Sequence, residues 1–193
     1  MDRTLYQVLK ATAIVVGVVV VGLMIWDSFF AEKIPGNLAY QQGNTFFEDG
    51  EYLQALRHYE EALVDRPDAP DYVRAKARTL MQLGRNDEAL AWYSRAIELQ
   101  PYFGGTYANR GILYDRMGRY ELAIADYDKA TQLDEEIVEG PHWLTRFLRN
   151  QPEKPPNISQ RADYLRQELK KPAEQRLLRV PEIDAQQRPY KQR

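Results

Sequence analysis

Residues 36–69 read GNLAYQQGNTFFEDGEYLQALRHYEEALVDRPDA, and two stretches of the same length and pattern follow them. Residues 70–103 read PDYVRAKARTLMQLGRNDEALAWYSRAIELQPYF, and residues 104–137 read GGTYANRGILYDRMGRYELAIADYDKATQLDEEI. Aligned without gaps, the three units share four identical columns: Gly50/Gly84/Gly118, Ala55/Ala89/Ala123, Tyr59/Tyr93/Tyr127 and Ala62/Ala96/Ala130. A fixed period of 34 residues indicates a tandem repeat in which each unit is one supersecondary structure.

Two further columns describe the shape of each unit. One is always small and the other is always large and apolar: Gly43/Ala77/Gly111 and Phe46/Leu80/Tyr114. Small residues let two helices pack closely, and the glycine of each unit suits a left-handed helix end. The pattern therefore predicts one helix-turn-helix hairpin per unit, with the tyrosine filling the gap to the next unit. About three such units are needed before stacking buries enough apolar surface.

The spacing and residue types of these columns resemble the tetratricopeptide repeat. The resemblance covers about half of the chain, residues 36–137, and implies an all-α helical solenoid of three repeats. Members of that family bind peptides, build scaffolds and assist assembly without any shared chemistry. The resemblance is thus specific for the fold and general for the function.

Composition excludes several kinds of site. The chain has 193 residues and no cysteine, which removes disulfides, thiolate metal sites and cysteine nucleophiles. Its net charge of -2 is unevenly distributed. Residues 36–139 hold 19 acidic and 11 basic side chains, whereas residues 140–193 hold 6 acidic and 12 basic ones. An acidic repeat array is followed by a basic tail.

The amino-terminal residues 1–33 are predicted to form a transmembrane anchor. Residues 11–26 read ATAIVVGVVVVGLMIW without a charge. Tyr6 and Trp26 lie about 30 Å apart along a helix, which matches the hydrocarbon thickness, and aromatic residues suit both membrane interfaces. The segment 6–26 is therefore the expected membrane contact. Only a short connector, residues 32–35, separates the anchor from the first repeat.

A cleaved signal peptide is the alternative to an anchor. Cleavage would best follow Ala31, but Phe29 is too large for the small residue required two positions before the cut. The positive charges of Arg3 and Lys10 place the amino terminus in the cytoplasm by the positive-inside rule. The repeats are then expected across the membrane, in the periplasm if the source is bacterial.

The carboxy-terminal residues 138–193 are expected to close the array and extend beyond it. Residues 138–150 are predicted to be a capping helix, because Trp143 and Phe147 belong to an apolar stripe at helical spacing. Residues 151–193 form a basic, proline-containing extension that is partly helical. We expect a helix from an N-cap at Ser159 to about residue 171, and an extended or disordered chain from Pro181.

The sequence contains no pattern that predicts catalysis, a cofactor or a metal. His58 and His142 do not form a ligand pair with carboxylates, and Asp126 and Asp128 point to different helix faces. There is no phosphate-binding glycine loop and no nucleophile with a base nearby in sequence. We therefore expect a protein that is not an enzyme.

The inner surface of the solenoid is the better candidate site. Positions of the first helix of each unit that the repeat pattern does not use for packing are Tyr40, Asn44, Arg74, Arg78, Asn109 and Asp115. Arginine and asparagine side chains suit peptide carboxylates and backbone amides, so these residues are predicted to bind a partner. The alternative is that Arg74 and Arg78 are only the solvated face of a helix.

The resemblance also allows one known ligand to be considered. Some family members hold an acidic chaperone carboxyl terminus with a clamp of lysine, asparagine and arginine. Here Tyr40 stands where the first lysine would be, and Gly105 with Asn109 replaces the basic pair of the third unit. This ligand is therefore not expected, although another peptide or protein surface could use the groove.

The basic tail has two possible kinds of partner. Tyr164 and Tyr190 are too isolated for a base-stacking platform, so nucleic acid is not expected. An acidic protein surface or lipid headgroups fit better.

The sequence as a whole thus predicts a membrane-anchored interaction module that assists the assembly or stability of a membrane protein complex. A permanent accessory subunit of such a complex is the alternative, and an enzyme is a remote one.

Overall fold

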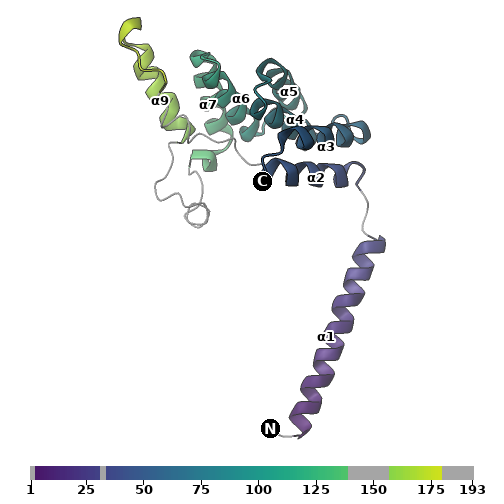
Figure 1. Ribbon diagram of the computed structural model, residues 1–193. Helices are drawn as coiled ribbons and strands as arrows, with labels where there is room; N and C mark the ends of the chain where they lie inside the picture. The colour runs from purple at the N-terminus through teal and green to yellow at the C-terminus, as the bar shows by residue number, and fades with distance from the viewer. Residues whose placement is uncertain (1–2, 31–33, 139–156, 180–193) are drawn as a thin grey trace. The chain divides into compact units, whose positions relative to one another are not determined.

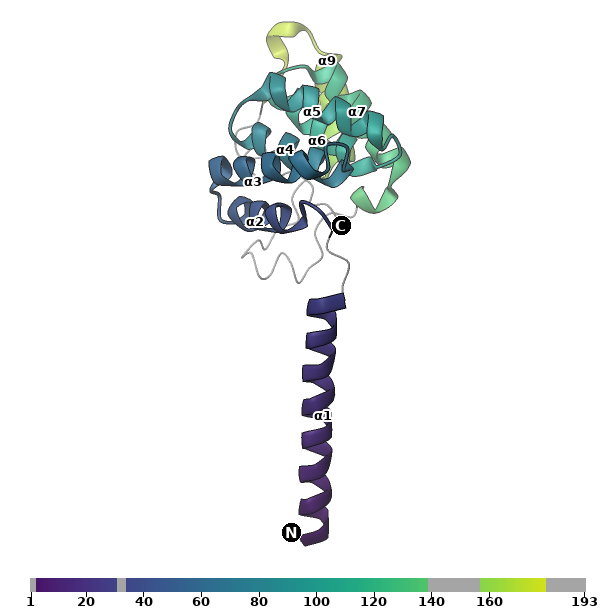
Figure 2. The same cartoon turned by 90° about the vertical axis from the view of Figure 1, so that its right-hand side faces the viewer.

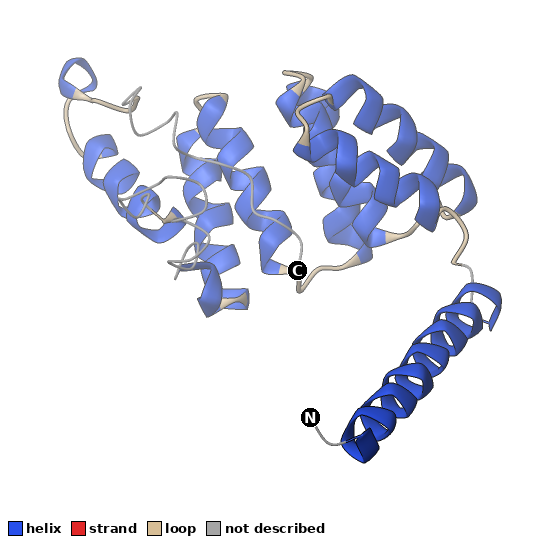
Figure 3. Cartoon of the chain, turned by 60° about the horizontal axis from the view of Figure 1, so that its bottom comes forward, coloured by secondary structure: helices blue, strands red, loops and turns tan. Residues whose placement is uncertain are grey.

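The computed structural model describes residues 3–30, 34–138 and 157–179, and every regular element in these ranges is a helix (Figures 1 and 3). The chain divides into two compact units, Met1–Ile34 and Pro35–Arg193. The helical fold agrees with the all-α class that the repeat pattern predicts.

The first unit is the helix α1, Arg3–Phe30. Its stretch Gln7–Trp26 has 20 residues and a mean hydropathy of 2.6, and none of it is buried by the rest of the chain. The Thr12 hydroxyl donates to the Val8 carbonyl at 3.0 Å, so this polar group is satisfied within the helix. By length and composition, α1 can cross a membrane.

The second unit begins with three helical hairpins (Figure 2). Their helices are α2 Asn37–Glu48 and α3 Tyr52–Asp65, α4 Pro70–Gln82 and α5 Asn86–Leu99, and α6 Gly104–Arg116 and α7 Tyr120–Leu133. Each 34-residue unit of the sequence contains one hairpin. A short 3-10 helix η1, Glu135–Val138, follows, and then α9 Ile158–Leu169 and the 3-10 helix η2 Ala173–Gln175.

Glycine ends the first helix of each hairpin. Gly50, Gly84 and Gly118 have φ values of 80°, 73° and 75°, in the left-handed region that a side chain disfavours. In the first hairpin, the N–H groups of Gly50 and Glu51 donate to the carbonyls of Phe47 and Phe46 at 3.2 and 2.8 Å, respectively. These bonds satisfy two carbonyls at the end of α2 and reverse the chain into α3.

The two helices of a hairpin meet at the tyrosine column. A Cβ added to Gly43 would lie 2.6 Å from the ring of Tyr59, and one added to Gly111 would lie 2.8 Å from the ring of Tyr127. The tyrosine therefore packs on the small residue of its own unit. Tyr59 also shares a buried cluster with Ala75 of the next unit, so the predicted contact between units is present as well.

The last hairpin is covered by α9. This helix packs against α7, much as α4 packs against α3 and α6 against α5. Its residues Ile158, Ala162 and Leu165 are buried, whereas its outward residues are exposed and polar: Gln160, Asp163, Gln167 and Lys170. An apolar inner face with a polar outer face is what a terminal helix of a solenoid requires.

The capping role thus belongs to α9 among the described residues. The cap predicted at residues 138–150, with Trp143 and Phe147, lies outside them apart from Val138 at the end of η1. The predicted N-cap at Ser159 is wrong. Asn157 is the N-cap: its side chain accepts from the Gln160 N–H at 2.8 Å, and the Gln160 side chain accepts from the Asn157 N–H at 3.1 Å. This reciprocal pair satisfies two helix donors, which one serine cannot do.

If α9 closes the array, Leu165→Ala should lower the free energy of unfolding by about 2 to 5 kcal/mol, because Leu165 is fully buried against the last hairpin. Urea denaturation of the full chain in detergent, followed by circular dichroism, measures the change. Gln167→Ala, an exposed substitution on the same helix, is the control and should change little. Equal stability of the two variants would contradict the capping role.

Candidate functional site

The residues predicted to line the groove are not the free surface that the sequence indicated. Arg74, Arg78, Asn109 and Asp115 are 4% to 7% exposed, and Tyr40 and Asn44 are half-buried. The alternative interpretation of Arg74 and Arg78 as a solvated helix face is also wrong. These side chains differ instead in whether other residues of the chain supply their hydrogen-bond and ion-pair partners.

Tyr40 and Asn44 of α2 are held by aromatic and polar contacts. The ring of Tyr40 stacks on that of Tyr72 from α4, with 4.7 Å between centroids. The Tyr59 hydroxyl donates to Asn44 Oδ1 at 2.8 Å. Burial raises the pKa of Tyr40, while its hydrogen bond to Asn44 acts in the opposite direction. Tyr40 therefore joins the first two hairpins, and Asn44 joins the two helices of the first one.

Arg74 of α4 is engaged inside the protein through its two terminal nitrogens, whereas its Nε–H has no acceptor in the described residues. Its guanidinium pairs with Asp71, donates to Gln100 Oε1 at 2.6 Å, and lies 4.1 Å from the centre of the Phe103 ring. Burial lowers its pKa, and the carboxylate of Asp71 counteracts that effect. Because its charge is already compensated, Arg74 has little capacity left for a partner.

Arg78, one helical turn further along α4, is placed differently. Its guanidinium lies 4.0 Å from the centre of the Phe47 ring, and it is hydrogen-bonded to the Tyr59 hydroxyl. Within the described ranges, no carboxylate forms an ion pair with Arg78, and its Nε–H has no acceptor. A buried cation of this kind is costly unless a further group satisfies it.

The three equivalent tyrosines also differ in whether their hydroxyl groups have an acceptor within the chain. The hydroxyl of Tyr59 donates to Asn44, and that of Tyr127 donates to Asp115 Oδ2 at 3.2 Å. The hydroxyl of Tyr93 in the middle unit has no acceptor in the part of the chain that the structure describes. The middle unit therefore contains three buried donors without an acceptor in the described residues: Arg74 Nε–H, Arg78 Nε–H and Tyr93 O–H. We call the last two the donor pair, because within these residues the guanidinium of Arg74 is already paired with a carboxylate and that of Arg78 is not.

Electrostatics connect the two members of the donor pair. Burial raises the pKa of Tyr59 to about 12 and also raises that of Tyr93, and the positive charge of Arg78 opposes both shifts. Arg116 acts on Tyr93 in the same direction. The hydroxyl of Tyr93 thus stays protonated in a region of positive potential, which suits an incoming hydrogen-bond acceptor of negative charge.

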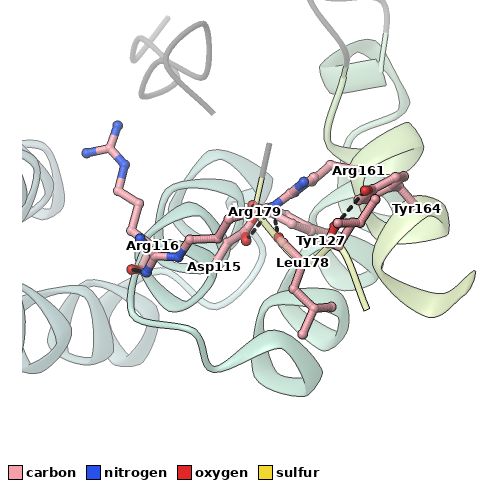
Figure 4. A network of polar contacts seen from close by, with 8 residues as sticks. Asp115, Arg116, Tyr127, Arg161, Tyr164, Leu178 and Arg179 are labelled. Atoms are coloured by element: carbon pink, nitrogen blue, oxygen red, sulfur yellow. Dashed lines mark hydrogen bonds and ion pairs between the residues drawn. The ribbon is translucent and has the colours of Figure 1, made fainter. Parts of the chain in front are cut away.

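Asp115, in contrast, is satisfied by the carboxy-terminal part of the chain (Figure 4). Arg161 of α9 binds it with two parallel hydrogen bonds, Nε to Oδ2 at 2.8 Å and Nη2 to Oδ1 at 2.9 Å. Both side chains are buried. This bidentate geometry is the strongest form of the pair, and it leaves Asp115 unavailable to a partner.

Residues 173–179, here called the strap, are hydrogen-bonded to α9 and to the end of α6. Arg161 Nη2 donates to the Leu178 carbonyl at 3.0 Å, Tyr164 donates to the Leu177 carbonyl at 2.6 Å, and Arg179 donates to the Arg116 carbonyl at 2.6 Å. In Figure 4 these contacts form one network, from which the guanidinium of Arg116 points away.

A buried carboxylate fastens the strap to α9 as well. Glu168 accepts from the Leu177 N–H at 2.8 Å and from Lys171 Nζ at 2.6 Å. These bonds lower the pKa of Glu168, the hydrogen bond from Leu177 most strongly. Arg176 donates to the Lys171 and Leu169 carbonyls at the end of α9. Sequence reasoning missed Arg161 and Glu168, because their partners are distant in the sequence or are backbone groups.

Among the described residues, no group of three His, Cys, Asp or Glu side chains could hold a metal ion. What the described residues of the site offer is hydrogen-bond donation from the middle unit.

Comparison with known proteins agrees with the geometry of the hairpins. Two family models, both described as tetratricopeptide repeat, match residues 40–102 and 72–141. Residues 40–141 therefore belong to the tetratricopeptide repeat family. The residues that the two models match include parts of all three hairpins.

The relatives of this repeat array include an Hsp70-Hsp90 organizing protein and a DnaJ homolog. Hsp70-Hsp90 organizing protein 2 of Arabidopsis thaliana is 29% identical over 70% of this chain and 23% of its own length. DnaJ homolog subfamily C member 3 of Gallus gallus is 29% identical over 66% of this chain and 25% of its own length. The chain thus spans about a quarter of these relatives.

Two solved structures share the fold. The Arabidopsis OM64 TPR domain has a TM-score of 0.51 at 20% identity, covering 53% of this chain and 84% of that domain. The first TPR of Spaghetti (RPAP3), bound to the HSP90 peptide SRMEEVD, has a TM-score of 0.52 at 21% identity, covering 68% of this chain and 96% of that one.

The buried pair Asp115–Arg161 leads to a testable prediction. Asp115→Ala should destabilise the array by about 3 to 5 kcal/mol, because it leaves the guanidinium of Arg161 buried without a carboxylate. The double variant Asp115→Ala with Arg161→Met should be more stable than Asp115→Ala alone, since the uncompensated charge is gone. A denaturation-based double-mutant cycle measures the coupling, and strictly additive effects would contradict a paired role.

Proposed function

We propose that this chain is a membrane-anchored tetratricopeptide repeat module that binds a protein partner and so assists the assembly or stability of a membrane protein complex. The observation that carries the proposal is the donor pair. The Nε–H of Arg78 and the hydroxyl of Tyr93 are buried and lack an acceptor in the described part of the chain, whereas the equivalent tyrosine hydroxyls of the first and third units are satisfied.

The donor pair indicates the chemistry of the partner. Two donors, one of them charged, require an acceptor, and a carboxylate or a backbone carbonyl of a polypeptide supplies one. The solved RPAP3 structure is bound to the peptide SRMEEVD, which contains acidic residues. For this chain we propose an acidic segment held at the middle unit, because the residues expected for a terminal-carboxylate clamp are replaced at Tyr40 and Gly105.

The burial of the predicted residues narrows the proposed docking surface. Asp115 and Arg74 form ion pairs within the chain, so we do not include them in the proposed docking surface. Arg78 is the centre of the surface, and Tyr40, Asn44 and Asn109 from the neighbouring units flank it. Tyr93 is fully buried, so its hydroxyl reaches an acceptor only when the middle unit loosens around a bound segment. These flanking residues can contact a bound segment with their polar groups without losing the packing that holds the hairpins together.

The membrane part of the proposal rests on α1. Its apolar side chains are unburied over Gln7–Trp26, so a bilayer is the environment that would remove them from water. The absence of a small residue at Phe29 favours an anchor over a cleaved signal. The charges of Arg3 and Lys10 favour repeats on the far side of the membrane from the amino terminus, in the periplasm of a bacterial cell.

A permanent accessory subunit is the second candidate, favoured by the short connector, since an array that starts a few residues after α1 stays close to membrane-bound neighbours. Purification of the full chain in mild detergent, with quantitative mass spectrometry, separates the two roles. A stoichiometric partner indicates a subunit, and a substoichiometric one indicates an assembly factor.

The donor pair can be tested with two small changes. Tyr93→Phe removes a hydroxyl that has no intramolecular partner, so stability should be unchanged or higher, whereas partner affinity should fall by roughly 3- to 10-fold. Arg78→Met should weaken capture further because it removes the charge. Co-purification yields measure binding, and thermal melts report the fold.

Arg95→Ala is the control for Arg78→Met, because Arg95 is an exposed arginine that pairs with Asp68 at the surface. If Tyr93→Phe and Arg78→Met keep normal partner yields while Arg95→Ala lowers them, the docking surface lies elsewhere.

The orientation can be tested with single cysteines, since the natural chain has none. Val64→Cys in α3 is 81% exposed and should react with a membrane-impermeant maleimide in intact spheroplasts. Asp2→Cys should react only after permeabilisation. The reverse pattern would place the repeats in the cytoplasm.

A further inference from the structure

The first helix of the array has an uncovered face. The side chains of Leu38, Gln41, Gln42 and Thr45, here called the α2 flank, are exposed, and Leu38 is 74% exposed. They occupy the same positions in the repeat as Tyr72, Ala75, Lys76 and Thr79 in α4. Tyr72, Ala75 and Thr79 are buried, so this face of the repeat is built for contact.

The preceding hairpin covers this face in the second and third units. Lys76 of α4 pairs with Glu60 of α3 at 2.8 Å, and Arg110 of α6 contacts Ser94 of α5 at 3.5 Å. At the other end of the array, α9 covers the flank of α7. Among the described residues, the α2 flank is thus the inter-unit face that nothing covers.

The chemistry of the α2 flank indicates what would cover it. Its four side chains carry no charge, although the repeats as a whole are strongly acidic, and the exposed charges that follow them lie at the carboxy-terminal end of α2, at Glu48 and Asp49. Around a twofold axis every side chain near the axis meets its own copy, so charges there would repel. Glutamine avoids this problem because its amide both donates and accepts, and leucine packs on leucine.

We infer that the α2 flank is a twofold interface with a second copy of this chain. The cap at the other end supports a closed dimer, because α9 occupies the surface on which an end-to-end contact between α2 and α7 would have to form. The array can therefore pair through its first helix without growing into a filament.

The contact needs help from the membrane, and in this respect the inference rests on the proposed anchor. One helix face buries much less than the roughly 800 Å² per partner of a stable interface. Confinement of α1 to a bilayer raises the effective concentration of the arrays. A Cβ added at Gly17 or Gly22 of α1 would meet nothing within 4 Å, and the absence of side chains there allows close approach of a second α1.

Disulfide cross-linking of the full chain in native membranes tests the interface. With Leu38→Cys or Gln42→Cys, mild oxidation should give a homodimer on non-reducing gels at a rate roughly tenfold above that of Val64→Cys, since the two arrays are held with these positions close. Val64 is the matched control, because it is exposed and apolar but lies on α3. Equal rates for all three variants would overturn the inference, and so would an adduct of Leu38→Cys with a different protein.

A charge change gives a second, independent measurement. In the Leu38→Cys background, Gln42→Glu should slow cross-linking several-fold because it places like charges opposite each other, whereas Gln167→Glu on the exposed face of α9 should not. An unchanged rate with Gln42→Glu would contradict a twofold contact. Carbonate extraction and the Tyr93-dependent capture of a partner report the anchor and the docking surface separately, so a failure of the dimer is distinguishable from a failure of the proposed function.

Discussion

The contact between a tyrosine ring and the small residue opposite it is the constraint on which each hairpin depends. The rings of Tyr59, Tyr93 and Tyr127 are fully buried, and they lie so close to the first helix that Gly43 and Gly111 have no room for a Cβ. This arrangement sets the distance between the two helices of a unit. It also buries a hydroxyl group in each unit, and every such group needs an acceptor.

The three units meet that requirement in different ways, and the differences define the candidate site. The first unit supplies an amide at Asn44, and the third supplies the carboxylate of Asp115. The middle unit has Arg78, a donor, at the position of Asn44, so its tyrosine lacks an acceptor in the described residues. The docking surface that we propose is thus a consequence of the same packing that makes the repeat, with one acceptor replaced by a donor.

The two ends of the array differ in a similar way. The last hairpin is covered by α9, which is fastened by the buried pair of Arg161 and Asp115 and by the strap. At the other end, no described residue covers the α2 flank of the first hairpin. If α1 lies in a bilayer, copies of the chain are concentrated there, and a second copy can cover that flank.

The sequence by itself determined the number, length and order of the hairpins, because four identical columns at a constant period constrain local structure through glycine conformation and close packing. It also located the apolar helix α1, since hydropathy and length are properties of one continuous segment. Which polar side chains are buried was decided only by the tertiary structure. Arg74 and Asp115 look like free groove residues in the sequence, yet they bind Gln100 and Arg161, which lie 26 and 46 residues away. The tertiary structure also decided which helix covers the last hairpin, because that depends on how the apolar face of α9 fits the flank of α7. Burial and hydrogen-bond satisfaction are properties of neighbours in space, and a periodic pattern along the chain does not specify those neighbours.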